Sequence, residues 1–195
     1  MKKAILTLGL AVCTCLAFVA TPTVAAPNGE GATAAAKPAA AKGASELVLD
    51  QWNDIGRKLT AMAEDFPEAK YEFKPTDAQR TFAAQLIHAA ASMYYFTDVA
   101  DGKKPRYSDD PKRDELKTKA QVVAFVKKCI ADGQAAIKAK GDKGMMEVID
   151  AGNNQMVPVY DLAYGLIEHS GEHYGQLVVY YRVAGLVPPE SRPKK

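Results

Sequence analysis

Apolar side chains recur at intervals of three and four residues in four separate stretches of this 195-residue chain. That spacing follows the 3.6-residue turn of an α-helix and gathers the apolar side chains on one face. None of the stretches shows the alternation of apolar and polar residues that is typical of a half-buried strand. Four helices with one apolar face each can bury those faces against one another. The sequence therefore predicts an all-α fold, a four-helix bundle.

Residues that start and stop helices set the limits of these stretches. The predicted helices span about residues 45–66, 76–101, 118–137 and 158–184. Ser45 is the expected N-cap of the first helix, and Thr118 with Gln121 forms a capping-box signature at the start of the third. Gly185 is expected to end the fourth. Residues 139–157 contain glycines, a short apolar segment and a Gly-Asn-Asn turn signal, so their conformation stays open between helix and loop.

The three histidines of the chain are its most informative polar residues. His169 and His173 are four residues apart on the apolar stripe of the fourth predicted helix, so both imidazoles can point at one spot. His88, on the flank of the second helix's stripe, could supply a third nitrogen. Three protein ligands with one open position are typical of catalytic metal sites. The alternative is that the histidines are core residues with hydrogen-bonded rings.

Residues 1–25 have the pattern of a secretory signal peptide. Lys2 and Lys3 precede an apolar run of about 17 residues, and small residues that suit cleavage end at Ala25. We therefore expect an exported protein, periplasmic or secreted, whose mature form is not embedded in a membrane. The alternative is an uncleaved anchor, because the apolar run is at the lower length limit of a membrane span.

The rest of the chain divides into a linker and one domain. Residues 26–45 are almost all small or polar and carry no large apolar side chain, which predicts a flexible linker. Residues 46–195 have the length of one ordinary domain. After signal cleavage Cys129 is the only remaining cysteine, so we expect no internal disulfide and an inert, buried thiol.

Charge excludes one class of partner. Loss of Lys2 and Lys3 with the signal leaves 23 basic and 23 acidic residues, so the mature chain has a net charge near zero. Nucleic-acid binding needs a basic face to neutralise phosphates. Nucleic acid is therefore not an expected partner.

Several separated motifs point to a known family. Residues 169–182 read HSGEHYGQLVVYYR and are followed by GLVPP at 185–189, while residues 82–88 read FAAQLIH. Trp52 and the segment YEFKP at 71–75 precede them. In this order and spacing the motifs resemble those of the DinB/YfiT-like family of bacterial four-helix bundles. The resemblance covers the whole predicted domain.

The resemblance implies a divalent metal ion, with zinc or nickel typical, held by His88, His169 and His173. Members of the family with known activity include transferases and isomerases that use low-molecular-weight thiols. Such thiols are kept reduced in the cytoplasm, so an exported chain departs from those members. We therefore expect a metal-dependent hydrolase or transferase acting on an unknown small molecule, with a non-catalytic binding or interaction module as the alternative.

Three polar residues near the histidines are candidates for supporting roles. Gln85 shares a helix face with His88, and Gln176 shares one with His173, so both are candidates for the pocket, the alternative being ordinary packing or capping. Glu172 could act as a general acid or base if its side chain turns inward, the alternative being a solvated surface carboxylate. Glu172 and Gln176 are the only candidates for catalysis, and the catalytic residue itself stays unknown.

The fourth predicted helix has two further features of composition. Glycines at 165, 171 and 175 lower its intrinsic stability, and we expect them to allow close helix packing, the alternative being close approach of a ligand. Five of the nine tyrosines also lie on this helix, at 160, 164, 174, 180 and 181. Tyrosine suits surfaces that are half buried and half wet, so a homodimer through this region is a hypothesis.

Overall fold

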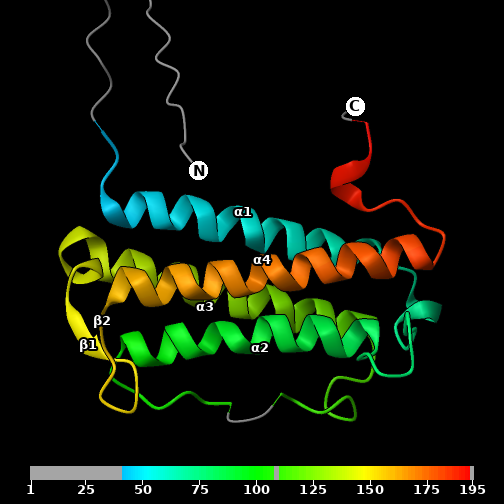
Figure 1. Ribbon diagram of the computed structural model, residues 1–195, viewed down its shortest axis with the longest axis horizontal. Coiled ribbons are helices and arrows are strands. Elements are labelled where there is room, and N and C mark those ends of the chain that lie inside the picture. The colour runs from blue at the N-terminus through cyan, green and yellow to red at the C-terminus, as the bar shows by residue number, and fades with distance from the viewer. Residues whose placement is uncertain (1–40, 108–109, 194–195) are drawn as a thin grey trace, which may run out of the picture. The chain divides into compact units, whose positions relative to one another are not determined.

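Four α-helices make up the fold and confirm the predicted all-α bundle (Figure 1). The computed structural model describes residues 41–107 and 110–193, so the predicted signal peptide and most of the predicted linker lie outside the described residues. The helices are α1 (Ala44–Asp65), α2 (Phe82–Ala100), α3 (Lys119–Met145) and α4 (Val159–Val183). Two 3-10 turns, η1 (Glu68–Lys70) and η2 (Pro189–Ser191), and two short strands, β1 (Val148–Asp150) and β2 (Met156–Pro158), complete the described elements.

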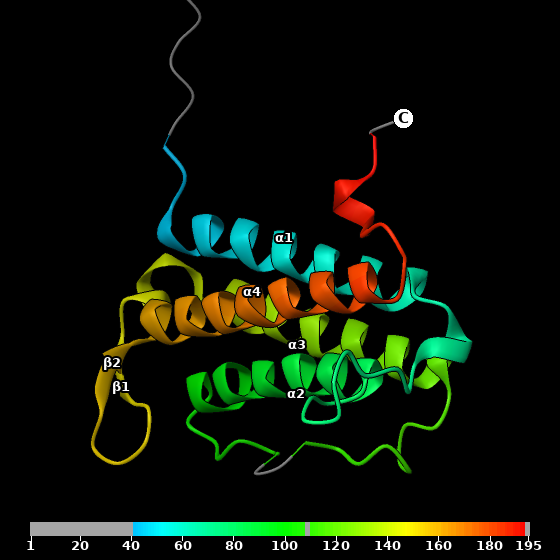
Figure 2. The ribbon, with the colours of Figure 1, turned by 45° about the vertical axis from the view of Figure 1, so that its right-hand side comes forward.

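Helix direction distinguishes this bundle from a simple up-and-down arrangement. α1 and α4 run one way, and α2 and α3 run the other way (Figures 1 and 2). α1 packs on α3 and α4, and α2 packs on the same two helices. Because α2 and α3 are parallel, the chain must return along the bundle between them. We call this return, residues 101–118, the crossover; its described parts, 101–107 and 110–118, run beside α2 (Figure 1).

Local signals located five helix ends correctly, two of which are the C-caps of α1 and α2, Phe66 and Asp101. Thr118 and Gln121 form the predicted capping box, with each side chain bonded to the other's backbone N–H. Pro158 and Ala184 flank α4, and Gly185 follows with a φ of 77° in the left-handed region that glycine favours.

The start of α2 differs from the prediction. The helix begins at Phe82 and not near residue 76, because Thr81 is its N-cap and accepts a hydrogen bond from the backbone of Ala84. The first backbone N–H groups of α2 also find acceptors upstream. Those of Phe82 and Ala83 donate to the carbonyls of Phe73 and Tyr71, both at 2.9 Å. α2 therefore begins where its free N–H groups are satisfied by the preceding segment.

The sequence analysis also placed the N-cap of α1 two residues too late. Gly43 is the N-cap, with no side-chain hydrogen bond, and the helix begins at Ala44. Ser45 lies inside the first turn, where its backbone N–H donates to the carboxylate of Asp142 at 2.9 Å. A contact from the end of α3 therefore satisfies the N–H group that a cap would otherwise bind.

Residues 139–157 hold structure that the sequence pattern did not resolve. α3 continues to Met145 through a kink at Gly141, whose φ is 56°. β1 and β2 then form an antiparallel hairpin in which Ile149 is opposite Val157. Strands of three residues are too short to show a period of two, so they were missed. The predicted turn at residues 152–154 is confirmed, with positive φ at all three positions.

The core is centred on the fully buried Trp52 of α1. Its indole N–H donates to the carbonyl of Ile130 at 3.0 Å, and its ring lies 5.2 Å from that of Phe96. Gly133 on α3 faces the same ring, so closely that a Cβ there would overlap it. The close approach of α1 and α3 therefore depends on the missing side chain.

The glycines of α4 do not serve helix packing, so that expectation was wrong. A Cβ at Gly165, Gly171 or Gly175 would meet no heavy atom within 4 Å. Of the tyrosines on this helix, Tyr180 and Tyr181 are buried inside the bundle and Tyr164 is exposed. None of the described helices has the length and hydrophobicity needed to cross a membrane.

Two glycine-to-alanine variants should separate packing from helix propensity. Gly133→Ala should destabilise the protein by about 1–3 kcal/mol, because the new methyl group must displace the Trp52 ring. Gly171→Ala should stabilise it by about 0.5–1 kcal/mol, because alanine gains helix propensity in open space. Urea unfolding of both variants beside wild type measures the difference. Equal effects of the same sign would contradict this account of the core.

Candidate metal centre

The three histidines meet in the middle of the bundle. His88 comes from α2, and His169 and His173 come from successive turns of α4. One ligand atom from each lies within 4.8 Å of the others, and the ring centroids are 4.3 to 5.4 Å apart. The sequence analysis placed these residues together correctly, and the group could hold a metal ion.

The spacing of the donor atoms suits a single ion. The Nε2 atoms of His169 and His173 are 3.0 Å apart. Two nitrogen ligands of a tetrahedral zinc ion, each about 2.0–2.1 Å from it, are about 3.3 Å apart. A small adjustment of either ring would therefore reach ligand geometry. The residues present fit the metal that the family resemblance implies.

The electrostatic environment keeps two of the rings neutral. Burial, followed by the neighbouring histidines His169 and His88, lowers the pKa of His173 from 6.5 to about 4. Burial, followed by His88, also lowers the pKa of His169. Both imidazoles are therefore neutral at neutral pH, which is the form that binds a metal ion.

His88 has a carboxylate partner that the sequence analysis missed. Its Nδ1 lies 3.0 Å from Oδ1 and 2.9 Å from Oδ2 of Asp110, a residue of the crossover. Ring nitrogens that face away from a metal are commonly bonded to a carboxylate in this way. Asp110 stands among charged residues and prolines in a loop, where no periodicity relates it to a distant helix.

The two candidate glutamines lie beside His173, and neither is among the residues that line the pocket next to the histidines. Gln85 is buried, and its side-chain amide contacts Nδ1 of His173. The same amide donates to Oε1 of Gln176 at 2.7 Å. Gln176 is itself exposed, and its side chain also interacts with His173.

Glu172 lies on the surface. Its side chain is exposed and makes no hydrogen bond or ion pair with the described residues. The carboxylate therefore does not turn inward as a general acid or base at the histidines. Its solvated alternative from the sequence analysis fits the structure.

A pocket of about 330 Å³ opens on one side of the histidines. His88 and His169 form part of its wall, and the other lining residues are Ala91, Ser92, Tyr95, Tyr107, Asp110 and Leu166. Its size is at the lower end of the range for small-molecule sites, and its mixture of apolar walls and a few polar groups is also typical of them. Two of the three histidines are thus accessible to a small molecule.

Cys129 takes no part in this site. The thiol is fully buried in the core, and burial raises its pKa from 9.0 to about 12. A thiol in this state is neither a nucleophile nor a ready metal ligand. The expectation of an inert, buried cysteine is confirmed.

Comparison with known proteins identifies the family of this chain. A family model described as the DinB superfamily matches residues 26–177, more than half of the chain. The chain belongs to the DinB superfamily. No curated protein matches it significantly.

Solved structures of similar fold carry the same family description. A DinB-like protein from Bacillus cereus ATCC 10987 has a TM-score of 0.62 at 18% identity, covering 74% of this chain and 95% of that one. The DinB-like protein YjoA from Bacillus subtilis has a TM-score of 0.61 at 18% identity, covering 76% of this chain and 99% of that one. At this level of identity the likeness establishes the DinB fold.

The metal-free protein should lose stability as the pH falls from about 6.5 towards 5. In that range the unfolded chain takes up a proton at His173 that the folded protein does not, so the free energy of unfolding falls. The paired carboxylates of Asp65 and Asp98 have pKa values below 3.8 and stay charged there. Urea unfolding in the presence of a chelator measures the effect. The free energy of unfolding of His173→Leu should depend less steeply on pH. An unchanged dependence would contradict the lowered pKa of His173 in the folded protein.

Proposed function

We propose that this DinB protein is exported and binds one divalent ion, zinc or nickel, through His88, His169 and His173. We further propose that it is a metal-dependent hydrolase or transferase that acts on a small molecule in the adjoining pocket. The observation that carries the proposal is that the pocket opens directly on His88 and His169. An ion that served stability alone would need no such access.

The donor set is compatible with the proposed metals. Neutral imidazole nitrogens suit zinc, nickel, copper and iron, and the family resemblance favours the first two. When bound, such an ion lowers the pKa of a coordinated water or polarises a substrate group. The proposal of export rests on the signal-peptide pattern of residues 1–25.

The residues of the chain would have two further roles, which are to hold the metal ion and to bind the small molecule. The three histidines hold the ion, and Gln85 orients the ring of His173. The pocket offers apolar surface from Ala91 and Leu166 and hydroxyl groups from its tyrosines and serine. A molecule with an apolar part and one metal-binding polar group fits this lining.

A second candidate function is a non-catalytic binding module, in which the metal captures a ligand without turnover. This alternative is favoured by the surface position of Glu172, which does not line the pocket. The pocket has one carboxylate, Asp110, and that group already bonds to His88. The carboxylate of the pocket lining is therefore not free to act as a base for proton transfer.

Metal content tests the proposal first. The protein, purified without a metal-affinity column, should carry close to one zinc or nickel ion per chain by plasma mass spectrometry. His173→Ala should lose the ion, because two imidazoles hold it much more weakly than three. Glu172→Gln is the matched control on the same helix turn and should keep it. A wild-type protein that is empty and also refuses added zinc and nickel would exclude the metal function.

Cobalt substitution tests access from the pocket. The visible bands of the cobalt(II) protein should change on addition of imidazole, because the small ligand can reach an open coordination position through the pocket. Ala91→Leu, which fills part of the pocket, should weaken imidazole binding, and Gly171→Ala should leave it unchanged. Bands that do not respond to imidazole would indicate a closed, structural site.

A further inference from the structure

The crossover between α2 and α3 forms one wall of the candidate metal centre. Tyr107 and Asp110 belong to it, and both line the pocket beside His88. The parallel direction of α2 and α3 forces this segment to run back along the bundle (Figure 1), and its Asp110 contacts His88 of α2. The segment that connects the helices is thus also in contact with a candidate ligand.

The contact between Asp110 and His88 has a definite chemical consequence. A carboxylate oxygen accepts hydrogen bonds from a ring N–H, so the contact with Asp110 places the ring proton of His88 on Nδ1. The lone pair then lies on Nε2, the nitrogen that does not face Asp110. That arrangement is the one in which Nε2 is free to bind a metal ion.

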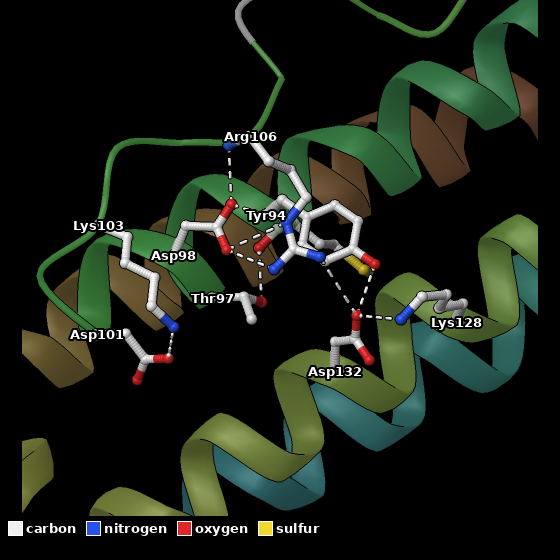
Figure 3. A network of polar contacts seen from close by, with 9 residues as sticks. Tyr94, Thr97, Asp98, Asp101, Lys103, Arg106, Lys128 and Asp132 are labelled. Atoms are coloured by element: carbon white, nitrogen blue, oxygen red, sulfur yellow. Dashed lines mark hydrogen bonds and ion pairs between the residues drawn. The ribbon is translucent and has the colours of Figure 1, made fainter.

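Arg106 fixes the crossover four residues before Asp110 (Figure 3). Its backbone N–H and its guanidinium all donate to the carboxylate of Asp98, at 2.6 to 3.2 Å. The Asp98 side chain is 4% exposed, and Arg106 is its hydrogen-bond partner within the described residues. A buried carboxylate is strongly destabilising without its cation, so this pair holds the crossover firmly to α2.

A second set of contacts extends the anchor to α3. The guanidinium of Arg106 lies over the ring of Tyr94, 3.8 Å from its centroid. The Tyr94 hydroxyl donates to Asp132 of α3 at 2.6 Å, and Lys128 contacts the same carboxylate at 2.7 Å (Figure 3). Arg106 therefore ties the crossover to both of the parallel helices that it connects.

The part of the crossover that follows Asp110 also makes contacts with the rest of the domain. Arg113 donates to Glu72 at 2.7 Å, and the capping box of Thr118 and Gln121 ends the crossover. Asp110 thus stands between two fixed points. The ion pairs on either side of it do not touch the histidines.

We propose that Asp110 is a positioning residue for the metal centre and that the Arg106–Asp98 pair sets its place. Asp110 holds the His88 proton on Nδ1, and Arg106 keeps the crossover where Asp110 can do so. The proposal rests on metal binding by the three histidines, but the protonation of His88 is a property of the metal-free protein. The two ideas can therefore fail separately.

Zinc affinity measures the effect on binding. By competition with a chromophoric chelator, Asp110→Ala should bind zinc about 10–100-fold more weakly than wild type, the range typical for loss of such a partner. Asp110→Asn retains a carbonyl acceptor and should recover part of the loss. Asp114→Ala is the matched control, because Asp114 is an exposed aspartate of the same crossover with no hydrogen bond to the described residues. It should bind zinc as wild type does.

The position of the His88 ring proton can be measured directly in the metal-free protein. Long-range ¹H–¹⁵N spectra of the three histidine rings distinguish protonated from unprotonated nitrogens, and His88→Gln identifies the His88 signals. Wild type and Asp114→Ala should show a proton on Nδ1 of His88, and Asp110→Ala should lose that preference. Arg106→Lys keeps the charge but not the planar fork, and should shift the same signals in the same direction.

The outcomes separate the two hypotheses. If wild type binds no zinc while the His88 spectrum responds to Asp110→Ala as expected, the proposed metal function fails and the positioning contact stands. If wild type binds zinc, and Asp110→Ala matches Asp114→Ala in both affinity and ring spectrum, Asp110 has no positioning role. If Asp110→Ala has its effect and Arg106→Lys has none, the anchoring part of the proposal is wrong.

Discussion

Parallel packing of α2 and α3 is the constraint on which the rest of this structure depends. Two parallel neighbours in a bundle cannot be joined by a tight turn, so the chain must travel the length of the bundle between them. Here the return segment passes His88 and contributes Tyr107 and Asp110 to the pocket. A loop that topology requires thus also supplies the one carboxylate among the residues that line the pocket.

Much of the fold could be predicted from the sequence because its signals are local. The capping box of Thr118 and the C-terminal Gly185 act within a few residues of themselves, and both were located correctly. The start of α2 could not be predicted in this way. Thr76, Asp77 and Thr81 are all acceptable caps, and the choice among them depends on carbonyl groups of the preceding segment. That choice is made by tertiary contacts, which sequence spacing does not contain.

The candidate site likewise contains residues that the sequence predicted and residues that it did not. His169 and His173 were paired by helical spacing, and the family motifs added His88. Asp110 lies 22 residues from its partner, in a loop of no regular period. Its role depends on where Arg106 binds, and that ion pair is itself a contact between a loop and a helix. Glu172 shows the limit of sequence proximity: it is close in sequence to two histidines, but its side chain is exposed, as the solvated alternative described.

The buried Cys129 has a consequence for where the domain can fold. Its thiol lies in the core with a pKa far above neutral pH, so it forms thiolate too rarely to exchange with glutathione or with a partner disulfide. Among residues 41–107 and 110–193 it is the single cysteine, and packing rather than a covalent cross-link holds the helices together. Assembly of the bundle therefore requires neither an oxidant nor a disulfide isomerase, and the same native state is accessible in reducing and oxidising compartments alike.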